Sequence, residues 1–399
     1  MRLRVVHLTC VHPADDPRIF QKECVSLAEL GYEVHLVAAG ATTARVGGVS
    51  IVATPGSLGR LGRMTLSARD VVQRASQIPA DIYHLHDPEL LPRGVCLKRR
   101  TGGVVIYDSH EFFREDVSDK EWIPRLLRQP VAALAATGER VAVRRLSGVV
   151  AVNAPMAEEF APHARRVTVV ANYPRRDLFS VRPDASVRPE SIIYAGAIDR
   201  RIHFPLMLDA MSRLRGRRPA STCTVLGQVQ SSSVDSPSKA SRDLLGANGI
   251  VLRDRVAHQD LASVLASHAV GWLPFVRKTH LEYAMPTKLI ETMAVGRPVV
   301  VSDLPLMRSI VERFRCGIVV PWDDSRAHAA ALERLLVEPA EAATLGDNGA
   351  RAVREEMNWE CQVPALVRLY RDCLADAVYE GLGLRWHDVK SMQESNGER

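Results

Sequence analysis

Short β-branched apolar segments alternate with helical segments along almost the whole chain, and this pattern constrains the fold more than any other feature. The predicted strands of the first half are LRVVHLT, YEVHLVA, GVSIVAT, DIYHLH, VVIYD and GVVAV, and those of the second half are SIIYAG, STCTVLG, GIVLRD, AVGWLP, PVVVSD and GIVV. Strands of this kind are typical of parallel sheets that helices cover on both faces. We therefore predict the α/β class, with two facing, doubly wound Rossmann-like domains.

The segment 172–190 interrupts the alternation, because it is rich in Pro and Arg and has no hydrophobic period. We interpret it as the interdomain linker. The first domain then spans 1–175 and the second 190–358, with long helical stretches at about 325–357 and 359–379 and a frayed tail at 380–399. Ligands of such sheets bind at the carboxyl ends of the strands, so the cleft between the domains is the expected site.

Composition narrows the class of protein further. The seven cysteines are scattered without a CxxC pair, which excludes a disulfide framework and a structural zinc finger. No apolar run approaches the ~20 residues needed to cross a bilayer, and the first residues do not form a signal peptide. The net charge of +6 is spread along the chain. We therefore expect a cytoplasmic protein with no nucleic-acid partner.

The segment EWIPRLLRQPVAAL (121–134) alternates basic and apolar residues. We favour a core-facing helix with a solvated arginine edge. The alternative is a peripheral contact with the inner face of the membrane, beside a substrate that is linked to a lipid.

The stretch AMPTKLIETMAVGRPVV is the most informative part of the second half. Pro286 and Thr287 mark a helix start, where the backbone amides and the positive helix end favour a diphosphate. Lys288 stands in the first turn, and Glu291 follows on the same face, where a carboxylate could accept two ribose hydroxyls. Gly296 ends the predicted helix. The alternative is an amphipathic helix with a surface Lys–Glu pair.

Histidines and carboxylates follow two strands of the first half. His84 and His86 share one face of DIYHLH and Asp87 follows them, while His110 and Glu111 close VIYDSHE. The loop VHPADDPRI adds further polar residues, although Asp16 is a plausible helix cap. The candidates of this half to bind a ligand are Asp15, Arg18, His86 and Asp87. Two alternatives stay open, namely packed histidines in a parallel sheet and a zinc site built around HxHD.

Several of these segments resemble a known family. PTKLIETMAVGRPVV is similar to the nucleotide-sugar motif of the family-4 glycosyltransferases, which are retaining enzymes of the GT-B fold, and SIIYAGAID resembles the strand and turn that open their C-terminal domain. DIYHLHDPELLP and VIYDSHE resemble the N-terminal half of bacterial members, which build polysaccharides, cell-wall glycans or glycosylated metabolites. The family also implies a C-terminal helix that crosses back onto the first domain, for which 359–379 is the candidate.

The resemblance implies a reaction. A sugar passes from a UDP-sugar or GDP-sugar to a hydroxyl of a glycan, lipid-linked or small-molecule acceptor, with retained anomeric configuration. The leaving phosphate takes the acceptor proton, and neither a metal nor another cofactor is required. Two other classes remain as alternatives, a pseudo-enzyme that binds nucleotide sugar, and an epimerase or phosphorylase of the same fold.

The resemblance also assigns residues. The implied catalytic residues are His110, Lys288 and Glu111. The acceptor-binding candidates are Asp15, Arg18, His86 and Asp87. The implied nucleotide-sugar contacts are Gly196, Arg200, Arg201, Glu282, Tyr283, Pro286, Thr287, Lys288, Leu289 and Glu291. The chain departs from the family pattern twice, because Tyr283 replaces a glutamate and Ala197 replaces an arginine. Glu282 and the pair Arg200 and Arg201 are the candidates to supply the lost charges.

Overall fold

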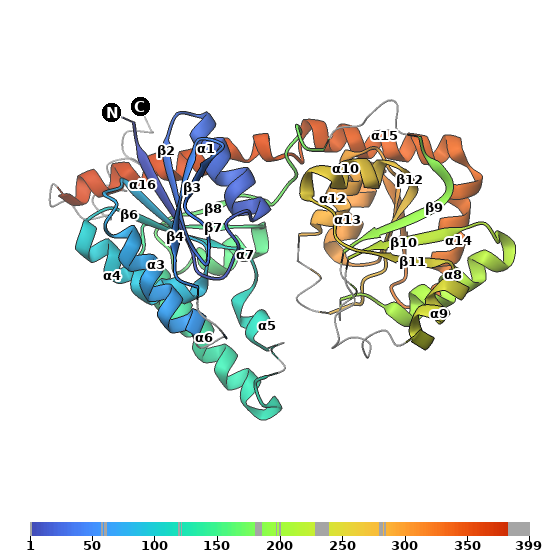
Figure 1. Ribbon diagram of the computed structural model, residues 1–399, viewed down its shortest axis with the longest axis horizontal. Coiled ribbons are helices and arrows are strands. Elements are labelled where there is room, and N and C mark those ends of the chain that lie inside the picture. Colours follow the sequence, from blue (N-terminus) through green and yellow to red (C-terminus); the bar gives the residue numbers. More distant parts are fainter. Residues whose placement is uncertain are drawn as a thin grey trace. The chain divides into compact units, whose positions relative to one another are not determined.

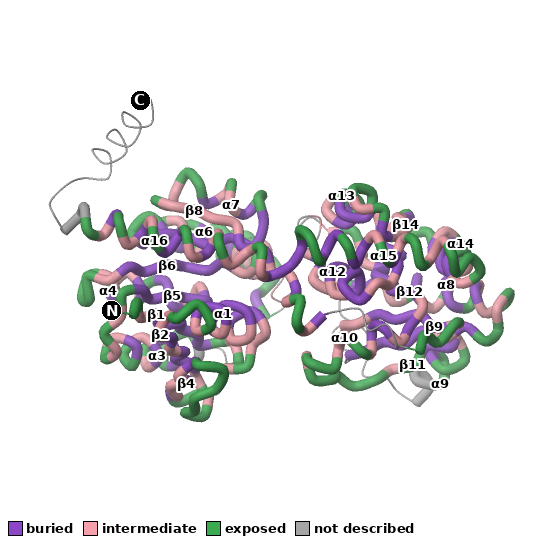
Figure 2. Tube along the Cα trace, turned by 90° about the horizontal axis from the view of Figure 1, so that it is seen from above, coloured by how far each residue is buried: buried purple, intermediate pink, exposed green. Residues whose placement is uncertain are grey.

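The computed structural model describes residues 2–56, 59, 62–118, 120, 122–179, 186–196, 198, 201–227, 239–278, 282 and 285–381. The chain forms two compact units, one of residues 1–171 and 362–399 and the other of residues 172–361 (Figure 1). Each unit holds a parallel sheet with helices on its faces, which confirms the predicted α/β class. The buried stretches of the chain follow the central strands of each sheet (Figure 2).

The sheet of the first unit has the strand order β3-β4-β2-β1-β5-β6-β7-β8, and only β3 runs antiparallel to its neighbour. Its strands are β1 (Arg4–Thr9), β2 (Glu33–Ala39), β3 (Ala44–Val46), β4 (Val49–Thr54), β5 (Ile82–Leu85), β6 (Val104–Ser109), β7 (Gly148–Ala151) and β8 (Val167–Val169). The six predicted strands are all present. The short β3 and β8 escaped prediction because neither contains a buried residue.

The helices of the first unit cover both faces of this sheet. They are η1 (Pro17–Cys24), α1 (Val25–Glu29), η2 (Arg63–Ser67), α3 (Ala68–Ala75), η3 (Pro88–Leu90), α4 (Leu91–Thr101), α5 (Phe113–Ser118), η4 (Arg125–Leu127), α6 (Arg128–Val143), α7 (Ala154–Phe160) and α16 (Val363–Gly381). Asp16 caps η1, since its Oδ1 accepts hydrogen bonds from the backbone N–H groups of Arg18 (2.8 Å) and Ile19 (3.0 Å), as predicted. The last helix, α16, returns to pack against β6, β7 and β8 (Figure 1).

The sheet of the second unit has the order β11-β10-β9-β12-β13-β14 and is parallel throughout its described strands. The strands are β9 (Arg188–Ala195), β10 (Thr222–Leu226), β11 (Ile250–Arg253), β12 (His268–Leu273), β13 (Val299–Ser302) and β14 (Gly317–Val320). Along β9, Ile193 packs into the core on one face of the sheet, and Ile192 and Tyr194 pack into the core on the other. This alternation buries both faces, as the sequence predicts.

The helices of the second unit are α8 (Phe204–Arg217), α9 (Lys239–Ala247), α10 (His258–Ala266), α12 (Thr287–Ala294), α13 (Pro305–Phe314), α14 (Ser325–Val337), α15 (Pro339–Glu355) and η5 (Trp359–Cys361). Gly296 adopts φ 70° just beyond α12 and ends it as predicted. The single helix predicted over 325–357 is wrong, because Pro339 starts a new helix after α14. The linker prediction is wrong for its first part, because Phe179 is buried in a core of the second unit.

The segment 121–134 does not form the core-facing helix that we favoured. Ile123 and Ala132 are buried, but Leu126, Leu127 and Leu134 are 92, 52 and 73% exposed. Apolar side chains therefore line the outer side of η4 and α6. Among the described residues, none of the helices combines the length and apolar character required of a membrane span.

Candidate functional site

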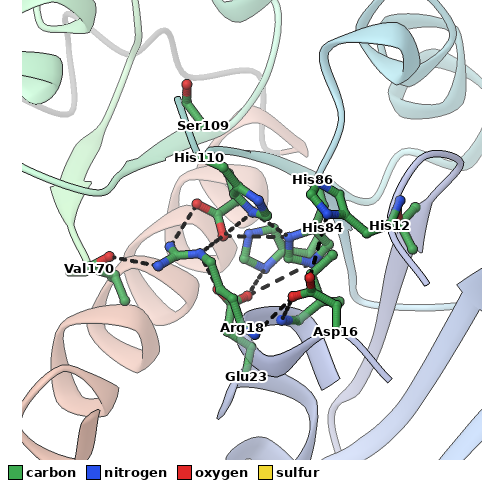
Figure 3. Close-up of polar contacts among 12 residues, drawn as sticks. His12, Asp16, Arg18, Glu23, His84, His86, Ser109, His110 and Val170 are labelled. Atoms are coloured by element: carbon green, nitrogen blue, oxygen red, sulfur yellow. Dashed lines mark hydrogen bonds and ion pairs between the residues drawn. The ribbon is translucent and has the colours of Figure 1, made fainter. Parts of the chain in front are cut away.

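Polar side chains gather at the carboxyl ends of β1, β5 and β6 in the first unit (Figure 3). His7 on β1 pairs in register with His84 on β5, so both side chains project from the same face of the sheet. His86 follows on that face, and the ring centroids of the three histidines lie 4.7–5.1 Å apart. The parallel register thus brings His7 together with two imidazoles that lie about 80 residues further along the chain.

Contacts between side chains continue from these histidines toward the surface. His7 Nδ1 lies 2.8 Å from His86 Nε2, and His86 Nδ1 lies 3.2 Å from His110 Nε2. His110 Nε2 also lies 3.2 Å from Asp108 Oδ2. The His110 side chain is 16% exposed, whereas those of His86 and Asp108 are fully buried. Among these contacting side chains, His110 is therefore the one that a ligand can reach.

Arg18 does not reach the surface, where we expected it to meet the acceptor. It is 4% exposed, and its Nε and Nη2 donate to the two carboxylate oxygens of Asp108 at 3.0 and 2.9 Å (Figure 3). Its Nη1 donates to the carbonyl of Val170 at 3.2 Å. Arg18 thus anchors η1 to β6 and positions Asp108 beneath His110, since a bidentate pair fixes both planar groups.

His86 and Asp87 are also buried, at 2 and 1% exposure, so neither presents an open surface to an acceptor as we expected. Asp87 Oδ2 accepts hydrogen bonds from Thr9 Oγ1 (3.0 Å) and from the backbone N–H of Cys10 and of Val11 (3.3 Å). The carboxylate therefore ties the loop after β1 to the end of β5.

His12 lies over the accessible end of this cluster, with its ring centroid 5.1 Å from that of His110. Burial alone would lower the pKa of His12, but its hydrogen bond with Asp16 and the charges of Asp87 and Glu111 raise it above the usual range. Asp15 and Glu111 are exposed. The entrance to the cluster thus carries a partly exposed imidazole among carboxylates.

Burial sets the protonation of the deeper groups. It holds the pKa of His7 and His84 well below the usual range, and the neighbouring imidazoles act in the same direction. The pKa of Asp108 stays well below its usual range because Arg18 outweighs burial. Burial and the nearby Asp108 hold the pKa of Glu23 well above its usual range.

In the second unit, the end of β9 meets the first turn of α12. A Cβ atom built on Gly196 would lie 2.2 Å from Lys288 Cε and 2.7 Å from Tyr194 Oη. A side chain at position 196 would therefore displace the Lys288 side chain from its path across the end of β9. The structure brings together Gly196 and Lys288, two residues of the predicted donor site that are far apart in the sequence.

The predicted donor-site residues at the start of α12 differ in their exposure to solvent. Thr287, Lys288 and Glu291 are partly exposed, whereas Pro286 is buried. Leu289 is fully buried in the core, and its backbone N–H donates to the Pro286 carbonyl at 2.9 Å. The Leu289 side chain is therefore not available to a ligand at the surface of α12, and contact of this residue with the nucleotide sugar stays a prediction for its backbone alone.

The residues expected to supply the lost charges are only partly described. Glu282 accepts a hydrogen bond from Arg277 Nε at 2.9 Å, and Arg201 is exposed with its carbonyl bonded to the N–H of Val276. Arg200 and Tyr283, together with Ala197, lie outside the described residues.

Sequence reasoning missed His7, Glu23 and Asp108. The sequence did contain a signal for His7 and Asp108. Both lie on predicted strands, with the same alternation of residues that pointed to His84 and His86. For Glu23 there was none, since its burial depends on elements from three parts of the chain.

Comparison with known proteins assigns both halves of the chain to glycosyltransferase models. Residues 22–173 match the model described as Glycosyltransferase Family 4, and residues 189–338 match the one described as Glycosyl transferases group 1.

Curated relatives are similar over most of the chain. A MMP alpha-(1->4)-mannosyltransferase of Mycolicibacterium hassiacum is 26% identical over 305 residues, covering 74% of this chain and 72% of that protein. A phosphatidyl-myo-inositol mannosyltransferase of Mycolicibacterium smegmatis is 23% identical over 347 residues, covering 83% and 84% of the two chains.

Solved structures share the fold. Sucrose-phosphate synthase from Thermosynechococcus elongatus superposes with a TM-score of 0.72 at 17% identity, covering 94% of this chain and 100% of that one. HepE of Anabaena in complex with UDP and glucose superposes with a TM-score of 0.68 at 14% identity, covering 93% and 100%.

Proposed function

Because the chain belongs to the family-4 glycosyltransferases and has the GT-B fold, we propose that it transfers a sugar from a UDP-sugar or GDP-sugar to an acceptor hydroxyl with retained anomeric configuration. The second unit binds the donor through its diphosphate and ribose. The first unit presents the acceptor and His110. The leaving phosphate takes the acceptor proton, so the reaction at the donor requires no metal.

The contact between Lys288 and Gly196 is the single observation that carries the donor site. Lys288 lies in the first turn of α12, where helix amides and the positive helix end already favour an anion. Its side chain crosses the end of β9, which is where ligands bind in open parallel sheets. The ammonium group would stabilise the departing diphosphate, while Glu291, three residues further on, would accept ribose hydroxyls.

His110 is the group that we propose to face the donor sugar. Its Nε2 contacts both Asp108 and His86, so the ring is held from below and its outer edge remains accessible. An imidazole held in this way could bind a sugar hydroxyl and steady charge near the anomeric carbon. Asp15 and Glu111, both exposed, would meet acceptor or sugar hydroxyls.

A nucleotide panel tests the donor site. Thermal unfolding is followed with UDP, GDP, ADP and dTDP for the wild type, Glu291→Ala and the control Glu333→Ala, which changes a glutamate of α14. A diphosphate at 100 times its dissociation constant adds about 2.7 kcal/mol, a shift of several degrees. One nucleotide should stabilise the wild type and the control, but not Glu291→Ala. Failure of all four to stabilise the wild type would refute the proposed donor.

A second test addresses the chemistry. With the donor identified by the panel, His110→Ala should lower kcat by about 10²-fold or more while the nucleotide shift stays unchanged. NMR of the first product formed should show the anomeric configuration of the donor. Full kcat in His110→Ala removes the proposed role of the histidine, and an inverted product removes the proposed retaining mechanism.

For the acceptor, we propose a lipid-linked hydroxyl reached at the cytoplasmic face of a membrane. The exposed leucines Leu126, Leu127 and Leu134 line η4 and α6, and the exposed Arg125 stands beside them. Apolar side chains beside basic ones suit an interface with anionic lipid. One relative is itself named for phosphatidyl-myo-inositol.

Vesicle flotation tests this contact. Liposomes with anionic lipid should carry the wild type upward, and Leu126→Glu and Leu134→Glu should each weaken binding about tenfold, which corresponds to about 1.4 kcal/mol of lost apolar burial. Leu244→Glu, which changes an exposed leucine of α9, serves as the control. Equal flotation of all variants would argue for an acceptor that is free in solution.

A further inference from the structure

The carboxyl group of Glu23 is buried at the centre of the histidine cluster without a hydrogen-bond partner for either oxygen. Its Oε2 instead faces three imidazole nitrogens at nearly equal distances. These are His84 Nδ1 at 3.7 Å, His7 Nδ1 at 3.8 Å and His86 Nε2 at 3.9 Å. The distances are too long for direct hydrogen bonds, yet they are those of groups arranged around a shared central atom.

The buried carboxyl groups of the cluster outnumber the guanidinium group that faces them. Arg18 is the buried guanidinium nearest to Glu23, with Nε 3.3 Å from Glu23 Oε1, but its N–H groups donate to Asp108 and Val170. One cation therefore faces two carboxyl groups. Because the N–H groups of this guanidinium are committed to Asp108 and Val170, a divalent cation beside Glu23 would compensate a carboxylate that otherwise accepts no hydrogen bond.

We propose that Glu23, His7, His84 and His86 bind a divalent transition-metal ion, with zinc as the first candidate. In the described part of the chain, these four residues offer ligand atoms that all lie within 4.8 Å of one another. Around a zinc ion with bonds of about 2.1 Å, tetrahedral ligand atoms lie about 3.4 Å apart, so the contacts of Glu23 Oε2 at 3.7–3.9 Å must shorten and the 2.8 Å contact between His7 and His86 must lengthen. Small side-chain movements are enough for both changes.

Two hydrogen bonds must give way when the ion binds. His7 Nδ1 and His86 Nε2 lie 2.8 Å apart and share a proton, and Tyr370 Oη lies 2.6 Å from His84 Nδ1. The ion takes these nitrogens as lone-pair donors, so the proton between the two imidazoles moves to another nitrogen or leaves, and the Tyr370 hydroxyl rotates away. Burial and Asp108 hold the pKa of Glu23 well above its usual range, so the ion displaces a proton from this carboxyl group and metal binding should release it.

The site would be structural rather than catalytic. All four ligands are buried and no position faces the surface, whereas catalytic zinc keeps one position open. The ion would nevertheless act on the reaction centre through His86. With Nε2 bound to metal, the proton of His86 must sit on Nδ1, which faces His110 Nε2 at 3.2 Å. His86 is in this sense a positioning residue for His110.

Metal analysis of the full chain tests the proposal. The protein is purified without a metal-affinity step, and bound metals are measured by plasma mass spectrometry for the wild type, Glu23→Gln, His84→Asn and the control His328→Asn. His328 is a buried histidine of the second unit that accepts a hydrogen bond from Trp272 Nε1 at 2.9 Å. We expect about one ion per chain in the wild type and the control, and its loss in the two cluster variants.

A second measurement uses the wild-type protein alone, so it does not depend on whether a variant folds. Apoprotein prepared with a chelator is titrated with Co²⁺, and a bound tetrahedral site gives visible absorption bands that zinc then removes. Binding should raise Tm by several degrees and release protons into weak buffer. A wild type that holds no metal as purified and shows neither cobalt bands nor a Tm shift with Zn²⁺ overturns the proposal. The cluster would then enclose a water molecule or a proton.

This outcome is independent of the donor site, because Lys288 and Glu291 lie in the other unit. A failed nucleotide panel would leave the metal proposal intact, and absence of metal would leave the proposed transfer intact.

Discussion

Substitution of Gly196 by alanine tests how closely the donor site depends on one missing side chain. The new Cβ would lie 2.2 Å from Lys288 Cε, whereas ordinary contact begins at 3.4 Å. The lysine must therefore move by about 1.2 Å, and a displacement of this size at a reacting centre costs about 10²-fold in rate. We expect kcat/KM for the donor to fall by about that factor, which corresponds to about 2.7 kcal/mol.

Stability should respond much less than activity. The atoms met by the new methyl group belong to the flexible end of a lysine and to a tyrosine hydroxyl, and both can give way. Gly216→Ala is the matched control, because a Cβ at that position of α8 meets nothing within 4 Å. Steady-state kinetics and thermal unfolding are measured on all three proteins. Wild-type kcat/KM in Gly196→Ala, at unchanged Tm, would refute the assignment of Lys288 to the donor.

Three further substitutions have predictable outcomes. Asp108→Asn removes one partner of a buried bidentate pair and leaves Arg18 facing Glu23 Oε1 at 3.3 Å without the two hydrogen bonds to Asp108, so urea unfolding should show a loss of about 3 kcal/mol. Burial raises the pKa of Glu139 to about 7 from an ordinary 4.5, so the fold favours its protonated form. That contribution is complete below about pH 4.5 and is lost as pH rises through 7, and a Glu139→Gln variant should lack this decline of up to about 3 kcal/mol. Leu289→Ala should cost about 2–5 kcal/mol in unfolding experiments but leave the nucleotide affinity of the folded protein unchanged, whereas a direct donor contact of its side chain would change both.

Local signals in the sequence were sufficient to predict most helices and strands. Asp16 predicted the start of η1, and Gly296 predicted the end of α12, because capping and left-handed backbone depend on neighbouring residues. The buried strands were equally legible, since a strand covered on both faces consists almost wholly of apolar residues. Pro339 carried a similar signal, and the single long helix predicted there ignored it.

The site was less predictable because it depends on packing between distant segments. Within its own helix, Glu23 looks like one of several polar residues, and the sequence does not reveal that β1, β5 and α16 enclose it. Leu289 illustrates a different limit of the sequence. A motif read as a continuous string treats neighbours alike, but adjacent residues of a helix point about 100° apart, so Lys288 lies at the surface while Leu289 enters the core.

The return of α16 to the first unit has a consequence for how the protein is made. Arg166, beside β8, forms a bidentate pair with Asp376 of α16 at 2.6 and 2.8 Å, and Tyr370 of the same helix closes over His84. The second unit is a continuous stretch of chain and can complete its fold on the ribosome before synthesis ends. The first unit begins earlier but finishes later, because the part of its sheet formed by β6, β7 and β8 lacks one covering helix until α16 has left the ribosome.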